Sequence, residues 1–363
     1  MKAAVCYEFG KPLVVEDVTI EPPGKGQVKV RIAAAAICHS DIHSIKGEHG
    51  PSKLPALSGH EVAGYVEEVG ENVTYVRPGD TVVACLVRAG CGECYYCVIG
   101  LPNLCERRRL EFKLPGPYYT RKGEQLIQFP GPFSGFQEYS IIPEECLVKI
   151  PKEMPMDRAA LLTCGVISGF GAVLNKAQVK PLSSVVVIGA GGVGLNAIQG
   201  AAFVGAHPVI AVDTLDNKLE AARVFGATHT INIKNETDPV EAVKKITYGR
   251  GADYVFVTVA GIEPKRQGFL MSARNGMTLF IGHGEKEYMS GWDAVELVSG
   301  KIVTGCGMGA TRTRVDIPRF VELYQAGRLK LDELITGHYS LDQINEAIAS
   351  VERGEALRNV IMF

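Results

Sequence analysis

The stretch SSVVVIGAGGVGLNAIQGAAFVGA, Ser183–Ala206, decides the fold of the second half of the chain. Its first seven residues form a short, largely apolar run closed by glycine, which predicts a buried strand. From Gly192 onward, apolar residues recur at helical spacing, so a helix is expected directly after the turn. The turn contains the pattern Gly189-x-Gly191-x-x-Gly194. A strand, a glycine-rich turn and a helix in this order predict a dinucleotide-binding unit.

An acidic residue stands where such a unit needs one. Asp213 ends the next strand-like run, HPVIAVD, 19 positions after Gly194. A carboxylate there accepts hydrogen bonds from the ribose hydroxyls of adenosine, while the pyrophosphate lies on the free N–H groups of the helix N-terminus. Because its negative charge repels a 2′-phosphate, Asp213 favours NAD over NADP.

The alternation of strands and helices continues to about residue 307. The strand-like runs are HTINI (229–233), ADYVFVTVA (252–260), GMTLFIG (276–282) and KIVTGCG (301–307), and helical segments are expected at 217–227 and 238–249. Such alternation predicts an α/β domain with a doubly wound parallel sheet.

The first 150 residues have a different character. The runs QVKVRIAAAAIC (27–38) and DTVVACLV (80–87) indicate strands, and they alternate with turns rich in proline and glycine. We expect a β-rich region here. A change of pattern within 363 residues favours two domains over one.

The totals exclude several classes of protein. The formal net charge is −2 and no basic stripe stands out, which argues against nucleic acid and anionic membranes as partners. No apolar run approaches the roughly 20 residues that span a bilayer. The N-terminus alternates apolar and polar residues without the features of a signal peptide. We therefore expect a cytoplasmic protein.

Four cysteines lie close together in VRAGCGECYYCVIGLPNLC, Val87–Cys105. Cys91, Cys94, Cys97 and Cys105 have the spacing C-x2-C-x2-C-x7-C. In a reducing compartment such clusters hold metal more often than they form disulfides. Four thiolates fill the tetrahedral shell of zinc, so this site is expected to be structural and to do no chemistry.

Other residues that could bind zinc are scattered along the chain. They are Cys38, His60, Glu61 and Cys164. Their spacing in the sequence does not indicate that they form one site. A lone buried cysteine is usually a small apolar residue, and a lone histidine is usually an ordinary surface or core residue.

Several separated motifs together resemble the zinc-dependent alcohol dehydrogenases of the medium-chain dehydrogenase/reductase superfamily, in their liver-type long form. The motifs are CHSDIH (38–43), GHE (59–61), the four-cysteine lobe, TCGVISGFGA (163–172), GAGGVG (189–194) and GEALRNVIMF (354–363). The similarity covers essentially the whole chain. It implies a GroES-like catalytic domain at 1–165 and 308–363, and a Rossmann cofactor domain at 166–307.

The resemblance also implies the role of each matching residue at the catalytic metal. The expected zinc ligands are Cys38, His60 and Cys164. Glu61 matches a carboxylate behind the metal, and Asp41 matches an acid that orients the histidine ligand. Ser40 and His43 match a proton relay.

Residues that match the cofactor site come from several segments. The adenosine side is expected at Gly189, Gly191, Gly192, Val193, Gly194, Asp213 and Lys218. His39 and Arg358 match basic residues near the pyrophosphate.

The function that follows from the resemblance is oxidation of an alcohol to an aldehyde or ketone, and the reverse, with hydride transfer to NAD. Two zinc ions per chain are implied, one catalytic and one structural. The long segment from Cys105 to Phe136 is typical of dimeric members, in which the strand matching KIVTGCG pairs across the two-fold axis. We therefore expect a homodimer that acts on a small-molecule alcohol or carbonyl compound.

The substrate stays open at this stage. Val87 stands where relatives often carry an aromatic residue in the substrate channel; Pro130, Gly131 and His283 also depart from the usual pattern, and the smaller residues indicate a wider pocket. A polyol, an amino alcohol or a thiol adduct of formaldehyde would suit the same fold.

Two further alternatives are a non-catalytic NAD-binding protein and a zinc-free quinone reductase of the same superfamily. The first has no need of the expected zinc ligands together with Ser40 and His43. The second should lack both zinc motifs.

Overall fold

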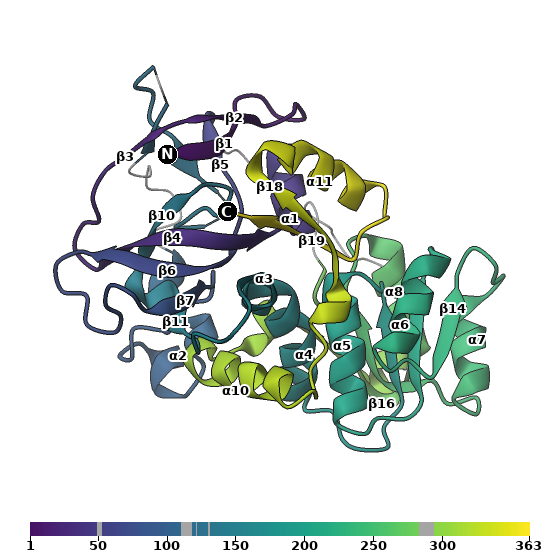
Figure 1. Cartoon of the computed structure of the whole chain (residues 1–363). Helices are drawn as coiled ribbons and strands as arrows, with labels where there is room; N and C mark the ends of the chain where they lie inside the picture. Colours follow the sequence, from purple (N-terminus) through teal and green to yellow (C-terminus); the bar gives the residue numbers. More distant parts are fainter. Residues whose placement is uncertain (49–52, 110–117, 121, 130, 283–293) are drawn as a thin grey trace. The chain divides into compact units, whose positions relative to one another are not determined.

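The computed structural model describes residues 1–48, 53–109, 118–120, 122–129, 131–282 and 294–363 (Figure 1). Pro130 and His283 lie outside the described residues. The described chain divides into two compact units. The first combines Met1–Cys164 with Arg312–Phe363, and the second is Gly165–Thr311.

The first unit is built mainly from antiparallel sheets. The larger sheet has the order β11-β7-β6-β4-β19-β18, with β10 also paired to β4. Its strands are β4 (Gln27–Ala36), β6 (Glu61–Val69), β7 (Thr81–Ala84), β10 (Tyr139–Pro143), β11 (Leu147–Lys149), β18 (Ile335–Ser340) and β19 (Arg358–Met362). A smaller sheet, β2-β1-β5-β9, contains β1 (Lys2–Cys6), β2 (Val14–Asp17), β5 (Ala56–Leu57) and β9 (Ile127–Gln128). β3 (Thr19–Ile20) pairs with β8 (Tyr118–Tyr119).

The sequence of β4 explains which face of the strand is buried in the core. Val28, Val30 and Ile32 are at most 1% exposed, whereas Lys29 and Arg31 between them point outward. Each such aliphatic side chain contributes about 1.5–3 kcal/mol on burial. Three alanines close the strand and are buried as well. Alternation along one strand thus builds a core face and a solvent face.

The described residues of the first unit contain several α-helices. They are α1 (His39–Ile45), α2 (Tyr95–Val98), α3 (Met156–Leu161), α10 (Thr313–Gln325) and α11 (Ile344–Glu352). Of these, α3, α10 and α11 contact strands of the larger sheet. The apolar core of the unit collects side chains from both ends of the chain, for example Val30 and Ile361. The C-terminal segment therefore belongs to the fold of the N-terminal part.

The second unit has a six-stranded sheet in which every neighbouring pair is parallel. The order is β14-β13-β12-β15-β16-β17. The strands are β12 (Val185–Ile188), β13 (Val209–Asp213), β14 (His229–Asn232), β15 (Ala252–Val257), β16 (Ser272–Phe280) and β17 (Ile302–Gly305). Numbered along the chain this is the order 3-2-1-4-5-6 of the Rossmann fold. The expected α/β fold class, with a β-rich GroES-like part and a Rossmann sheet, is confirmed.

The helices of the second unit are α4 (Ile167–Gly171), α5 (Gly192–Phe203), α6 (Asp216–Val224), α7 (Pro239–Ile246), α8 (Ile262–Met271) and α9 (Ala294–Val298). α8 was not indicated by the sequence pattern, because IEPKRQGFLM contains Pro264 and Gly268. The proline lies in the first turn, where its missing N–H costs no helical hydrogen bond.

The expectation that no apolar run approaches the length of a membrane span is wrong, because the helical run Met156–Ala177 is long and apolar enough to cross a membrane by length and composition. Within its most apolar window, 83% of the residues are buried inside the protein. That degree of burial is typical of a core helix.

Candidate metal centres and cofactor loop

The register of the larger sheet brings distant residues to one edge. Ala36, at the end of β4, pairs with Glu61 of β6 on one side and with Val360 of β19 on the other. The backbone N–H of Ile37 then donates to the carbonyl of Asn359 at 2.9 Å. Since Cys38 follows Ile37 directly, the sheet places it beside Glu61 and near Arg358.

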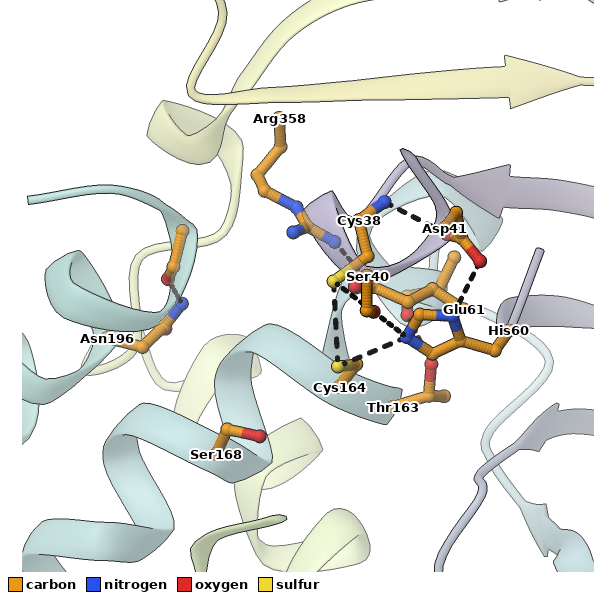
Figure 2. Close-up of polar contacts among 12 residues, drawn as sticks. Cys38, Ser40, Asp41, His60, Glu61, Thr163, Cys164, Ser168, Asn196 and Arg358 are labelled. Atoms are coloured by element: carbon orange, nitrogen blue, oxygen red, sulfur yellow. Dashed lines mark hydrogen bonds and ion pairs between the residues drawn. The ribbon is translucent and has the colours of Figure 1, made fainter. Parts of the chain in front are cut away.

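Cys38, His60, Glu61 and Cys164 form one buried cluster, with a ligand atom of each within 4.8 Å of the others (Figure 2). The Sγ atoms of Cys38 and Cys164 are 4.0 Å apart, and Nε2 of His60 lies 3.4 Å from Sγ of Cys164. Thiolates about 2.3 Å from a tetrahedral zinc ion lie roughly 3.8 Å from each other. The donor atoms and their separations therefore fit zinc.

Asp41 fixes the orientation of His60. Its Oδ1 atom lies 2.8 Å from Nδ1 of His60 and accepts a hydrogen bond from the N–H of Gly59 at 3.1 Å. Its Oδ2 atom accepts from the N–H of Cys38 at 3.1 Å. With Nδ1 facing Asp41, Nε2 turns toward the two thiols, which is the arrangement that metal-binding imidazoles use.

A buried ion pair stands behind the cluster. The guanidinium of Arg358 contacts Oε2 of Glu61, and Figure 2 shows the two side chains pointing at one another. Oε1 of Glu61 is buried and has no hydrogen-bond partner among the described residues. A buried carboxylate oxygen without a partner costs free energy unless a cation or donor satisfies it, so this atom also fits a neighbouring metal.

The electrostatics of the cluster favour a thiolate at Cys38 and a neutral thiol at Cys164, because the hydrogen bond to Cys38 and burial raise the pKa of Cys164 well above its usual value. Against the effect of burial, Asp41 raises the pKa of His60. A hydrogen bond from the thiol of Cys164, together with His60, holds the pKa of Cys38 well below its usual value. Burial raises the pKa of Glu61 to about 7, against the attraction of Arg358. Thiolate character at Cys38 is what a zinc ligand requires.

The four cysteines of the lobe also come together. The Sγ atoms of Cys91 and Cys97 are 3.9 Å apart, as are those of Cys94 and Cys105. All four lie within 4.8 Å of one another. Backbone N–H groups of Glu106 and Cys97 lower the pKa of Cys94 to about 6. Four sulfur ligands at tetrahedral spacing fit a structural zinc ion.

The glycine loop of the second unit joins β12 to α5. A Cβ atom at Gly194 would lie 1.7 Å from the carbonyl oxygen of Gly189, so only glycine fits there. The hydroxyl of Thr258, at the end of β15, lies 2.9 Å from the same carbonyl and holds the turn against the sheet. A Cβ atom at Gly191, which caps α5, would meet nothing within 4 Å, so the N-terminus of α5 has room for a phosphate group.

Asp213 lies at the end of β13, beside this loop. One carboxylate oxygen accepts the N–H of Ala190 at 2.7 Å, and the other accepts the N–H groups of Thr214 at 2.7 Å and Leu215 at 3.1 Å. The backbone thus holds the carboxylate at the glycine loop, the place expected for a ribose-binding acid.

The remaining expected site residues lie in several places. Gly191 caps α5, Gly192 and Val193 form its first turn, and Lys218 lies half-buried on α6. Ser40 joins the metal cluster: its hydroxyl is 3.2 Å from Sγ of Cys38 and 3.4 Å from Nε2 of His60. His39 is exposed at the start of α1, and His43 contacts Glu48.

Comparisons with known proteins agree with this arrangement. The model of the alcohol dehydrogenase GroES-like domain matches residues 24–152, and that of the zinc-binding dehydrogenase matches residues 192–325. The chain is 35% identical to alcohol dehydrogenase class-3 of Zea mays, over 99% of this chain and 96% of that protein. It belongs to the zinc-dependent alcohol dehydrogenases of the medium-chain superfamily. Its cofactors are zinc and NAD, and it is an NAD-dependent alcohol dehydrogenase.

Two other relatives are similar over their full length. S-(hydroxymethyl)glutathione dehydrogenase of Paracoccus denitrificans is 35% identical over 100% of this chain and 99% of its own. The structure of benzyl alcohol dehydrogenase from Acinetobacter calcoaceticus superposes with a TM-score of 0.92 at 32% identity, covering 100% of this chain and 99% of that one.

Within this alcohol dehydrogenase, sequence reasoning missed three contacts. The Glu61–Arg358 pair, the Thr258 hydroxyl on the glycine loop and the His43–Glu48 contact have no motif of their own. The first two join residues 297 and 69 positions apart, so only the fold reveals them.

Proposed function

We propose that Cys38, His60 and Cys164 hold the catalytic zinc ion of this alcohol dehydrogenase. This proposal rests on one observation: the three residues form a buried cluster with Glu61 in the first unit. When bound, zinc acts as a Lewis acid toward the oxygen of an alcohol or carbonyl group, and NAD accepts or donates hydride. Cys91, Cys94, Cys97 and Cys105 would hold the structural zinc ion.

The chain's own residues supply positioning and a path for the proton. Asp41 keeps Nε2 of His60 turned toward the cluster. The Ser40 hydroxyl, next to Cys38 and His60, would accept the proton of the substrate hydroxyl at Oγ while passing its own hydroxyl proton on along the path. His43, on the same helix and one-third exposed, would release that proton to solvent.

The cofactor would bind at the glycine loop. Gly189, Gly191, Gly192, Val193 and Gly194 would present backbone N–H groups to the pyrophosphate, and Asp213 would accept hydrogen bonds from the adenosine ribose. Lys218 would lie on the adenosine side, with His39 and Arg358 near the pyrophosphate. The pairing of Arg358 with Glu61 means that this guanidinium would serve the metal cluster as well.

The protein is proposed to be a cytoplasmic homodimer without nucleic-acid or membrane partners. The net charge of −2 supports the absence of polyanionic partners. β17 is the last strand of its sheet, and exposed apolar side chains accompany it: Val298 is 87% exposed and Ile302 is 45% exposed. A strand that has a neighbour on only one side among the described residues, with exposed apolar side chains beside it, favours pairing with a second copy. We retain the domain division 1–165 with 308–363, and 166–307, as part of the proposal.

The substrate is proposed to be a bulky primary alcohol, because Val87 replaces an aromatic residue expected in the channel. A relative named for benzyl alcohol and one named for a glutathione adduct of formaldehyde supply two concrete candidates. Steady-state oxidation with NAD and with NADP should be measured for ethanol, benzyl alcohol, a secondary alcohol, a polyol and S-(hydroxymethyl)glutathione. We expect a higher kcat/KM for benzyl alcohol than for ethanol. A polyol or the glutathione adduct as the best substrate would instead support one of the alternative dehydrogenases.

A further inference from the structure

The contact between His43 and Glu48 has no place in the function described so far. Nδ1 of His43 contacts Oε2 of Glu48, and both side chains reach solvent, with exposed fractions of 33% and 41%. Neither residue is within two positions of a proposed zinc ligand. The contact therefore lies at the outer end of the proposed proton path, where that path reaches solvent.

The end of α1 brings the two side chains together. The N–H of Glu48 donates to the carbonyl of His43 at 2.9 Å, and the N–H of Gly47 donates to that of Ser44 at 3.0 Å. These two bonds form a Schellman motif, which reverses the chain through a left-handed residue, here Gly47 with φ +79°. The reversal returns Glu48 to the turn that carries His43.

A carboxylate opposite an imidazole nitrogen constrains the proton on the ring. An ionised carboxylate only accepts hydrogen bonds, so Nδ1 must be the protonated nitrogen. In neutral imidazole the other nitrogen, Nε2, then carries the lone pair. A relay histidine needs a nitrogen with a free lone pair on the side from which the proton arrives.

We propose that Glu48 is a positioning residue of the proton path. Its carboxylate accepts the Nδ1 proton of His43 and so leaves Nε2 as the nitrogen that takes the proton from the substrate side. The imidazolium then releases one proton from Nε2 to water, which restores the Nδ1–H form. This inference rests on the proposed relay through His43.

Two further titratable groups lie near His43 and Glu48, namely Lys46 and His39. Lys46, which caps α1, pairs with Glu352 of α11 and also feels the charge of Glu48. The ring of His39 lies 6.4 Å from that of His43, centroid to centroid. Glu352 is a matched control, because it is a carboxylate that contacts Lys46, the residue that caps α1.

The test compares four variants with the parent: Glu48→Gln, His43→Gln, the double variant and Glu352→Gln. Glutamine retains the shape of Glu48 but can either donate or accept, so it no longer selects one tautomer. We expect Glu48→Gln to lower the rate of hydride transfer about threefold at neutral pH, within the roughly 10²-fold range of a relay group. The loss should vanish at alkaline pH, where hydroxide takes the proton. Glu352→Gln should match the parent at every pH.

The double variant decides whether Glu48 acts through His43. If it does, adding Glu48→Gln to His43→Gln lowers the rate no further. A pH-independent loss in Glu48→Gln, or additive losses in the double variant, would overturn the proposal in favour of a purely structural contact. A parental rate in His43→Gln contradicts the relay itself, whereas a slow His43→Gln with a parental Glu48→Gln contradicts only the role of Glu48.

A second readout does not depend on turnover. In protein labelled with ¹⁵N at histidine, the signals that disappear in His43→Gln identify this ring, and their shifts distinguish Nδ1–H from Nε2–H. The parent should show the Nδ1–H form, and Glu48→Gln should show a larger share of Nε2–H. An unchanged tautomer in Glu48→Gln would overturn the proposal.

Discussion

At the scale of single residues, Ser40 and His43 share a helix but differ in their surroundings. Ser40 lies against the metal cluster, 3.2 Å from Sγ of Cys38, whereas His43 lies half-buried beside Glu48. Ser40→Ala should therefore slow alcohol oxidation more than His43→Gln. We expect His43→Gln to lower the rate by about 10²-fold or less, because water can replace the imidazole as proton acceptor. Rates with deuterated alcohol, measured across pH, isolate the chemical step. Equal losses in the two variants at all pH values would contradict this order.

At the same scale, we expect Asp213 to determine the choice between NAD and NADP. Asp213→Ser should raise the preference for NADP relative to NAD about tenfold, equivalent to roughly 1.4 kcal/mol, by removing the charge that repels a 2′-phosphate. The affinity for both cofactors should fall somewhat, because the carboxylate also accepts the N–H of Ala190. The ratio of kcat/KM values for the two cofactors is the readout.

Asp216→Asn is the control for the cofactor experiment. Asp216 lies three positions further on and accepts a hydrogen bond from Asn232. This variant should leave the cofactor ratio unchanged. A parent protein that uses NADP better than NAD would contradict the assignment of Asp213.

At the scale of elements, the four-cysteine lobe depends on its metal. α2 has four residues and none of them is buried, so the lobe has little core of its own. Cys97→Ser should release one zinc ion per chain and lower the unfolding temperature, because metal binding contributes folding free energy directly. Calorimetry measures the unfolding temperature, and elemental analysis measures the zinc content per chain.

Cys6→Ala separates loss of metal from loss of a thiol. Cys6 is 3% exposed and lies outside both clusters, so this variant should retain both zinc ions. If Cys97→Ser keeps both zinc ions, the lobe does not hold one.

The arrangement of the elements also explains why the four-cysteine lobe and the glycine loop were easier to predict from the sequence than the catalytic cluster. The lobe and the glycine loop are local, since their residues lie within 15 and 6 consecutive positions, and local spacing carries their chemistry. The catalytic cluster joins three segments. The pairing of β4 with β6 brings Cys38 to His60, and the helical segment that follows α3, which packs on β4 and β6, brings Cys164. Only the resemblance to a family linked Cys38, His60 and Cys164. The contact between His43 and Glu48 depends on the reversal of the chain at Gly47, and no sequence motif predicts that reversal.

At the scale of the whole molecule, the free edge of the Rossmann sheet predicts the assembly. Val298 on α9 is 87% exposed and precedes β17, the edge strand proposed to pair with a second copy. Val298→Asp should convert a dimer into a monomer, because the interface would bury an unpaired charge. Light scattering at several concentrations measures the mass.

Val224→Asp is the matched control for the assembly. Val224 is 51% exposed on α6 of the same unit, away from β17 in the chain and in the strand order. This variant should remain dimeric. A parent that is a stable monomer or tetramer would contradict the proposed dimer.

The central claim is that each chain holds two zinc ions and that one of them is held by Cys38, His60 and Cys164. The most direct test is the zinc content per chain, measured by elemental analysis on active parent protein and on Cys164→Ala. We expect two zinc ions per chain in the parent, and one in a folded but inactive Cys164→Ala. One zinc ion or none in the active parent, or two in Cys164→Ala, would contradict it.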